Sequence, residues 1–152
     1  MVDIVHRIGM RAPLEKVFAA IATVDGVAGW WTRLTTGESS VGGKMNFGFT
    51  TPAGEPIGQF QMTVVERTPD QRVRWRVNDG PADWIGTEVD FSLSRQGDQT
   101  VLLFGHRHWR EAGESMAHCN MKWATFLLSL RDLVESGKGR PAPDDLKIDN
   151  WN

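Results

Sequence analysis

The chain has one cysteine, no tyrosine and no long apolar run. Cys119 alone excludes an intramolecular disulfide and is typical of a protein from a reducing compartment. A membrane-spanning helix needs about 18 consecutive apolar residues, which no stretch approaches. Asp3, His6 and Arg7 interrupt the N-terminal apolar residues, so this stretch does not resemble a signal peptide. We therefore predict a cytoplasmic protein that does not insert into a membrane.

Positive charge is not in excess. The 17 Lys and Arg residues are balanced by 19 Asp and Glu residues, which gives a formal net charge of −2. Binding to phosphates usually needs a basic surface, so this balance argues against nucleic acid as a partner. A length of 152 residues suits one self-sufficient domain. We expect this domain to span residues 1–141, followed by a tail, residues 142–152, that packs loosely or runs along the surface.

The usual signatures of catalysis and metal binding are also missing. No nucleophile is paired with a base at a recognisable spacing, so we assign no catalytic residue and expect a binding protein rather than an enzyme. His106, His108, His118 and Cys119 could supply up to four metal ligands. However, adjacent residues on a helix diverge by about 100°, so the last two cannot readily converge on one ion. We predict no metal and no cofactor.

Alternating apolar residues predict a strand over residues 3–10 and a series of strands between residues 34 and 108. Short turns between these strands predict antiparallel hairpins and a meander. The positions that alternate with the apolar residues are Arg72, Arg74 and Arg76 on one strand, and Glu88, Asp90 and Ser92 on the next. We expect these side chains to form a solvated face on which opposite charges pair across strands.

Two segments have helical spacing. Pro13 begins a short helix over residues 13–22, and apolar residues at intervals of three and four predict a long amphipathic helix over residues 114–136. Gly137 suits the left-handed position after its last turn. The predicted fold is α+β of the helix-grip type: a curved antiparallel sheet wrapped on a long C-terminal helix, with a small helical element after the first strand.

Four strings, in this order, carry a family resemblance: HRIGMRAPLEKVFAAIAT, VAGWWT, SSVGGKMNFGF and CNMKWATFLLSLRDLVESGKGRP. They resemble the START/Bet v 1-like (SRPBCC) superfamily, and most of all its branch of activators of heat-shock-protein ATPase homologues (AHSA-type). The resemblance spans about residues 3–141. It implies a β-α-α-β6-α order, a hydrophobic cavity between the sheet and the last helix, and a link to the stress response. It brings no catalytic residues, because the family's motifs mark the fold.

The inward phases of the predicted elements suggest a ligand-binding site. A pocket lined by large rings can stack on a flat ligand, although the same rings can equally fill a core. The inward histidines are either satisfied by neighbouring protein groups or exposed to the ligand. Asn46 and Gln59 are candidates for polar groups near the mouth. The predicted ligand-binding residues are His6, Trp30, Phe47, Phe60, Trp75, Phe91, Phe104, His106, Trp123 and Leu127.

The leading hypothesis is therefore a small soluble protein that binds an apolar or aromatic small molecule in an internal hydrophobic cavity. A first alternative is a cyclase- or hydratase-type enzyme in which a cavity histidine moves a proton. A second alternative is a co-chaperone-like stimulator of a chaperone ATPase, and it ranks third because the outer sheet face is expected to be neutral. Trp84 and Trp109, if exposed, leave open a homodimer contact.

Overall fold

Seven strands form one antiparallel sheet in the order β1-β7-β6-β5-β4-β3-β2. The predicted meander is confirmed, and the first strand extends it at one edge by pairing with β7. The computed structural model describes residues 1–152. Its elements are β1 (Val2–Met10), α1 (Leu14–Ala22), α2 (Val24–Ala28), β2 (Leu34–Gly37), β3 (Lys44–Thr50), β4 (Pro56–Thr68), β5 (Arg72–Asp79), β6 (Glu88–Gln96), β7 (Gln99–Trp109) and α3 (Glu114–Ser136).

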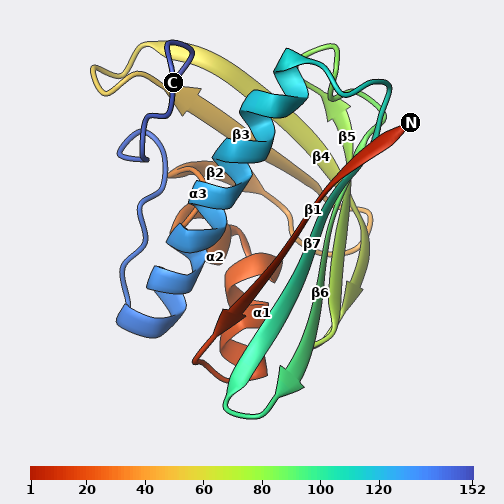
Figure 1. Cartoon of the computed structure of the whole chain (residues 1–152), viewed down its shortest axis with the longest axis vertical. Coiled ribbons are helices and arrows are strands. Elements are labelled where there is room, and N and C mark those ends of the chain that lie inside the picture. The colour runs from red at the N-terminus through yellow and green to blue at the C-terminus, as the bar shows by residue number, and fades with distance from the viewer.

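The long C-terminal helix lies across the curved sheet (Figure 1), as the helix-grip prediction requires. Its observed bounds, Glu114–Ser136, match the expected ones, and Gly137 ends it with a φ of 86°. Trp123, Leu127 and Leu130 on its inward face are buried. No helix in the structure is both long and apolar enough to cross a membrane. The sheet and α3 thus form two layers around one core.

The tail runs along α3, and it is held more firmly than loose packing would imply. The backbone N–H of Ala142 donates to Trp31 (2.8 Å), and the N–H of Arg33 donates to Ala142 (3.1 Å). Lys122, a charged residue of the amphipathic helix α3, is buried with Asp145 of the tail. The chain of residues 142–152 therefore covers part of α3 (Figure 1).

The outer face of the sheet carries the expected cross-strand ion pairs. Glu88 lies 3.5 Å from Arg74 and 3.8 Å from Arg76. Asp90 departs from the expectation, because its carboxylate pairs with Arg107 of β7 at 2.6 Å rather than with β5. A surface pair such as that of Arg76 with Glu88 contributes only about 0–1 kcal/mol, whereas the Asp90 carboxylate is buried. This face is therefore largely self-neutralising.

Trp84 and Trp109 are not exposed, which corrects one expectation. Their side chains are only 6% and 2% accessible. Trp84, in the segment between β5 and β6, stacks on Phe60 of β4, with 4.4 Å between ring centroids. Trp109 packs on His106 at 4.7 Å. Because both indoles lie inside the protomer, neither can form the homodimer contact considered above.

Candidate functional site

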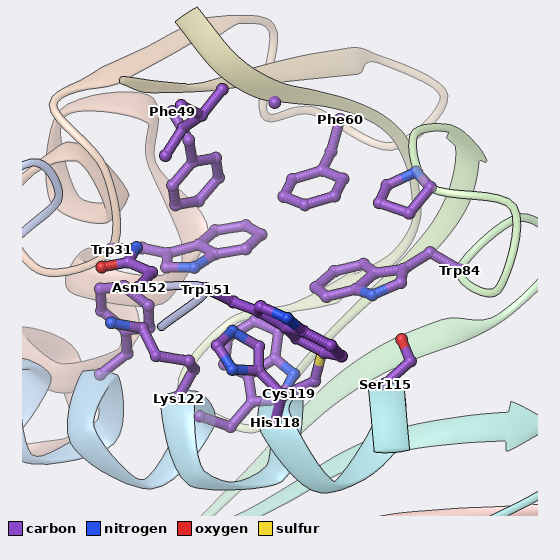
Figure 2. A pocket seen from close by; sticks show the side chains of 15 residues that line it. Trp31, Phe49, Phe60, Trp84, Ser115, His118, Cys119, Lys122, Trp151 and Asn152 are labelled. Atoms are coloured by element: carbon purple, nitrogen blue, oxygen red, sulfur yellow. The ribbon is translucent and has the colours of Figure 1, made fainter. Parts of the chain in front are cut away.

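A cavity of about 370 Å³ lies between α3, the sheet and the tail, and 15 residues line it. Figure 2 shows Phe49 and Phe60 opposite the α3 side chains Ser115, His118 and Lys122. Nearly half of the lining residues are aromatic, which gives the cavity a predominantly apolar wall. These aromatic residues are Trp31, Phe49, Phe60, Trp84, Trp123, Phe126 and Trp151.

Three of the rings are nearly parallel. The planes of Trp31 and Phe60 differ by 6°, with centroids 6.2 Å apart, and those of Phe60 and Trp84 differ by 10°. The adjacent Trp30 points elsewhere, into the core, where its Nε1–H donates to the Ala20 carbonyl (2.8 Å). Of the two neighbouring indoles, Trp30 therefore lies in the core and Trp31 lines the cavity. Parallel faces of this kind suit stacking with a flat ligand.

His106 is linked by hydrogen bonds to two residues of the cavity lining, Trp84 and Trp123. The Thr87 hydroxyl donates to the Trp84 carbonyl (2.5 Å), so its oxygen accepts from Nε2 of His106 (2.8 Å). The Trp123 Nε1–H donates to the other ring nitrogen, Nδ1 (3.1 Å). Burial lowers the pKa of His106 to about 3. This histidine is thus neutral, has no nitrogen free for a substrate and is satisfied by protein groups, the first of the two readings that the sequence left open.

Polar groups reach the cavity from α3. Burial raises the pKa of the Cys119 thiol to about 11, so the thiol stays protonated and is a poor nucleophile. The Lys122 ammonium donates to the Asp145 carboxylate and to the Leu146 carbonyl. Burial alone would raise the pKa of the Asp145 carboxyl, but hydrogen bonds from Lys122 and from Lys147 (2.9 Å) outweigh it and lower that pKa. The charge of Lys122 is therefore already compensated within the protein.

The end of the tail reaches the mouth of the cavity. His118 lies 2.7 Å from Asp149 through Nδ1, and its ring centroid lies 5.1 Å from that of Trp151. Asp149 also accepts from the backbone N–H groups of Trp151 (2.9 Å) and Asn152 (3.3 Å). The hydrogen bond from His118 is the main reason why the pKa of the Asp149 carboxyl is lowered. Trp151 and Asn152 are themselves part of the cavity lining.

Sequence reasoning missed this contribution of the tail, although a signal was present. His118 and Lys122 lie four residues apart, one helical turn, and Asp145 and Asp149 are also four residues apart. The pairs form in antiparallel order, His118 with Asp149 and Lys122 with Asp145. Matched spacing of bases on the helix and acids in the tail was the available clue.

Two of the ten predicted ligand-binding residues, Phe60 and Trp123, line the cavity. His6 is half-buried on β1, with its Nε2 buried and without a partner, and its ring lies 6.2 Å from that of Phe104. Strand alternation turns Asn46 to the outer face, where it accepts from Gln61 (3.1 Å). The other predicted residues lie in the core away from the cavity: Trp30, Phe47, Trp75, Phe91, Phe104, His106 and Leu127.

These features define a class of protein. A curved antiparallel sheet gripping a long C-terminal helix, with a short helix after the first strand, is the helix-grip fold of the Bet v 1-like superfamily. The family model described as "Activator of Hsp90 ATPase homolog 1-like protein" matches residues 11–135, and the chain belongs to this family.

Solved structures agree with this assignment. The solution structure of the Aha1 dimer from Colwellia psychrerythraea is 41% identical, with a TM-score of 0.78, and the match covers 91% of this chain and 100% of that chain. A Staphylococcus saprophyticus protein (15% identity, TM-score 0.74, coverage 93% and 98%) shares the fold. CalU16 from Micromonospora echinospora does so too (21% identity, TM-score 0.70, coverage 93% and 77%). Among proteins with curated descriptions, none matches this chain.

Proposed function

We propose that the protein binds a small, flat, apolar or aromatic molecule in the cavity between α3 and the sheet. The observation that carries this proposal is the set of near-parallel rings of Trp31, Phe60 and Trp84 in the cavity lining. The cavity volume of about 370 Å³ falls in the usual range for small-molecule sites. Affinity would come mainly from apolar burial, at about 25 cal/mol per Å² before ordering costs.

The state of His106 favours binding over catalysis. A general acid or base must reach the substrate and exchange a proton near the working pH. Both nitrogens of His106 are occupied by Thr87 and Trp123, and burial holds its pKa far below neutrality, at about 3. The cyclase- or hydratase-type alternative therefore loses His106, and the other histidine predicted for it, His6, does not line the cavity.

Binding can be tested in two steps. Native mass spectrometry of freshly purified protein asks whether a small molecule is retained, and calorimetric titration with the neutral aromatic 2-naphthamide measures occupancy directly. Ile57→Ala removes a half-exposed apolar side chain from the cavity lining, whereas Leu34→Ala removes a similarly exposed apolar side chain outside that lining. We expect weaker binding only in Ile57→Ala. No retained molecule and no heat of binding would contradict the proposal.

The family description favours a second candidate, stimulation of a chaperone ATPase. Such a role would use the outer surface rather than the cavity. The direct measurement is the ATP hydrolysis rate of Hsp90 with and without this protein. An unchanged rate at saturating protein would contradict this candidate.

The solved relative from Colwellia psychrerythraea is described as a dimer, and this supports a homodimer here. Light scattering coupled to size exclusion should then give twice the chain mass of 17.0 kDa. A mass equal to one chain across the accessible concentration range would contradict the homodimer.

A further inference from the structure

We infer that the cavity takes a planar aromatic molecule bearing one anionic group, and that the end of the tail, residues 148–152, occupies the mouth as an internal competitor for it. The inference rests on the proposed function and narrows it to one chemical class of ligand. Its basis is the combination of one aromatic ring and one carboxylate that the tail itself places beside His118.

The charges around the cavity favour an anion. None of the 15 lining residues is Asp or Glu, whereas His118 and Lys122 are both present. Lys122 is buried, and its ammonium is held by Asp145 and by the Leu146 carbonyl. His118 is paired only with Asp149, whose side chain is 38% exposed. An incoming anionic ligand can therefore replace Asp149 as the partner of the His118 imidazole.

The tail already presents the two groups that such a ligand needs. The Asp149 carboxylate can only accept, so Nδ1 of His118 carries the hydrogen that is donated across 2.7 Å. The Trp151 indole lies beside the same imidazole, with 5.1 Å between centroids, and forms part of the cavity lining. Trp151 remains 51% exposed, so much of its apolar surface is not buried by this position. A free aromatic acid that entered more deeply would bury its ring and keep the same bond to His118.

The attachment of the last residues is weaker than that of the residues before them. Upstream, the tail is fixed by the buried pair of Lys122 with Asp145 and by backbone bonds at Ala142. Downstream, the hydrogen bonds are internal to the turn, such as Ile148 N–H to the Asn152 carbonyl (2.8 Å), apart from the one between His118 and Asp149. Exposed ion pairs contribute little. Residues 148–152 can therefore leave the mouth while the rest of the tail stays bound.

Two matched probes test the ligand class by calorimetry on the full chain. 2-Naphthoate and 2-naphthamide share a ring system and differ in charge. In the wild type we expect naphthoate to bind more tightly than naphthamide, by about tenfold, because a hydrogen bond to a charged acceptor replaces one to a neutral acceptor. His118→Gln should remove this preference.

The competitor role is tested by releasing the tail. Asp149→Ala frees His118 and should increase the affinity for naphthoate relative to naphthamide, again by several-fold. Asp144→Ala is the matched control, because Asp144 is an exposed tail acid that pairs with Arg33 (2.5 Å) outside the cavity lining. It should leave both affinities unchanged.

The outcomes separate the two proposals. Equal binding of naphthoate and naphthamide to the wild type would overturn the anionic ligand class while leaving the proposed function standing. A wild-type preference for naphthoate that Asp149→Ala does not increase would overturn the competitor role of the tail. Binding of neither probe to the wild type or to Asp149→Ala would overturn the proposed function itself.

Discussion

Replacing His106 by phenylalanine should make the protein less stable at neutral pH and remove part of its pH dependence. The variant keeps a ring of similar size but leaves the Trp123 Nε1–H without its acceptor, a bond of 3.1 Å in the wild type. A buried donor that loses its acceptor costs about 1–3 kcal/mol. We expect the free energy of unfolding at pH 7.5 to fall by that amount.

The pH dependence follows from burial. The folded-state pKa of His106 is about 3, against 6.5 for the unperturbed group, so between these values the unfolded chain binds more protons than the folded one. The stability of the wild type therefore falls as the pH drops below 6.5 toward 3. At 1.36 kcal/mol per pH unit, this group alone makes the wild type about 2 kcal/mol less stable at pH 5 than at pH 7.5. His106→Phe has no such group, so its deficit relative to the wild type should shrink by about 2 kcal/mol at pH 5.

Urea unfolding at both pH values, followed by circular dichroism, measures the two free energies. Phe104→Leu is a suitable control, because Phe104 packs against Trp123 (4.6 Å between centroids) and its loss perturbs the same core without removing a titrating group. It should cost about 1 kcal/mol at both pH values. If the deficit of His106→Phe were the same at pH 5 and pH 7.5, the histidine would not be buried in its neutral form, and the reasoning would be refuted.

Three further predictions concern α3 and the tail. Lys122→Met leaves the buried Asp145 with Lys147 alone and should lower the free energy of unfolding by about 1–3 kcal/mol in urea titrations, so an unchanged midpoint would contradict the buried pair. Gly137→Ala should lower the free energy of unfolding by about 1–2 kcal/mol, because the residue has a φ of 86°, which a residue with a Cβ rarely adopts. An added Cβ would contact nothing within 4 Å, so this cost comes from the backbone alone, and equal stability would show that the helix ends differently. Cys119, with a pKa of about 11, should react with iodoacetamide at pH 8 about a hundredfold more slowly in folded than in unfolded protein, as followed by mass spectrometry; equal rates would refute its burial.

The fold was predictable from the sequence because its signals are local. Period-two alternation on each strand and the spacing of Trp123, Leu127 and Leu130 on α3 depend only on which face meets the core. The glycine after α3 marked the end of the helix for an equally local reason. The pairing of β1 with β7 at one edge of the sheet joins segments about a hundred residues apart, and no local pattern encodes it.

The candidate site was harder to predict, because inward phase does not distinguish a core from a cavity. Phe91 and Phe60 both occupy the inward phase, yet Phe91 is fully buried and Phe60 lines the cavity. The difference arises from the segment that carries Trp84 and from the tail that carries Trp151, and both reach the cavity from irregular chain. Their positions depend on long-range contacts, such as His118 with Asp149, which a pattern of hydrophobicity does not contain.

Hydrogen bonds fix the orientation of the rings around the cavity before any ligand enters, and this favours tight binding. The Trp84 carbonyl and the Trp123 indole are linked through Thr87 and His106 by hydrogen bonds of 2.5–3.1 Å. A side chain that is immobilised on binding costs about 0.5–1.5 kcal/mol, and rings that are already held avoid that cost. The one lining ring that is half exposed is Trp151, at the end of the tail. A ligand has to displace only this ring, because the other lining rings are already held in place. Variants of the tail should therefore change affinity without loosening the core.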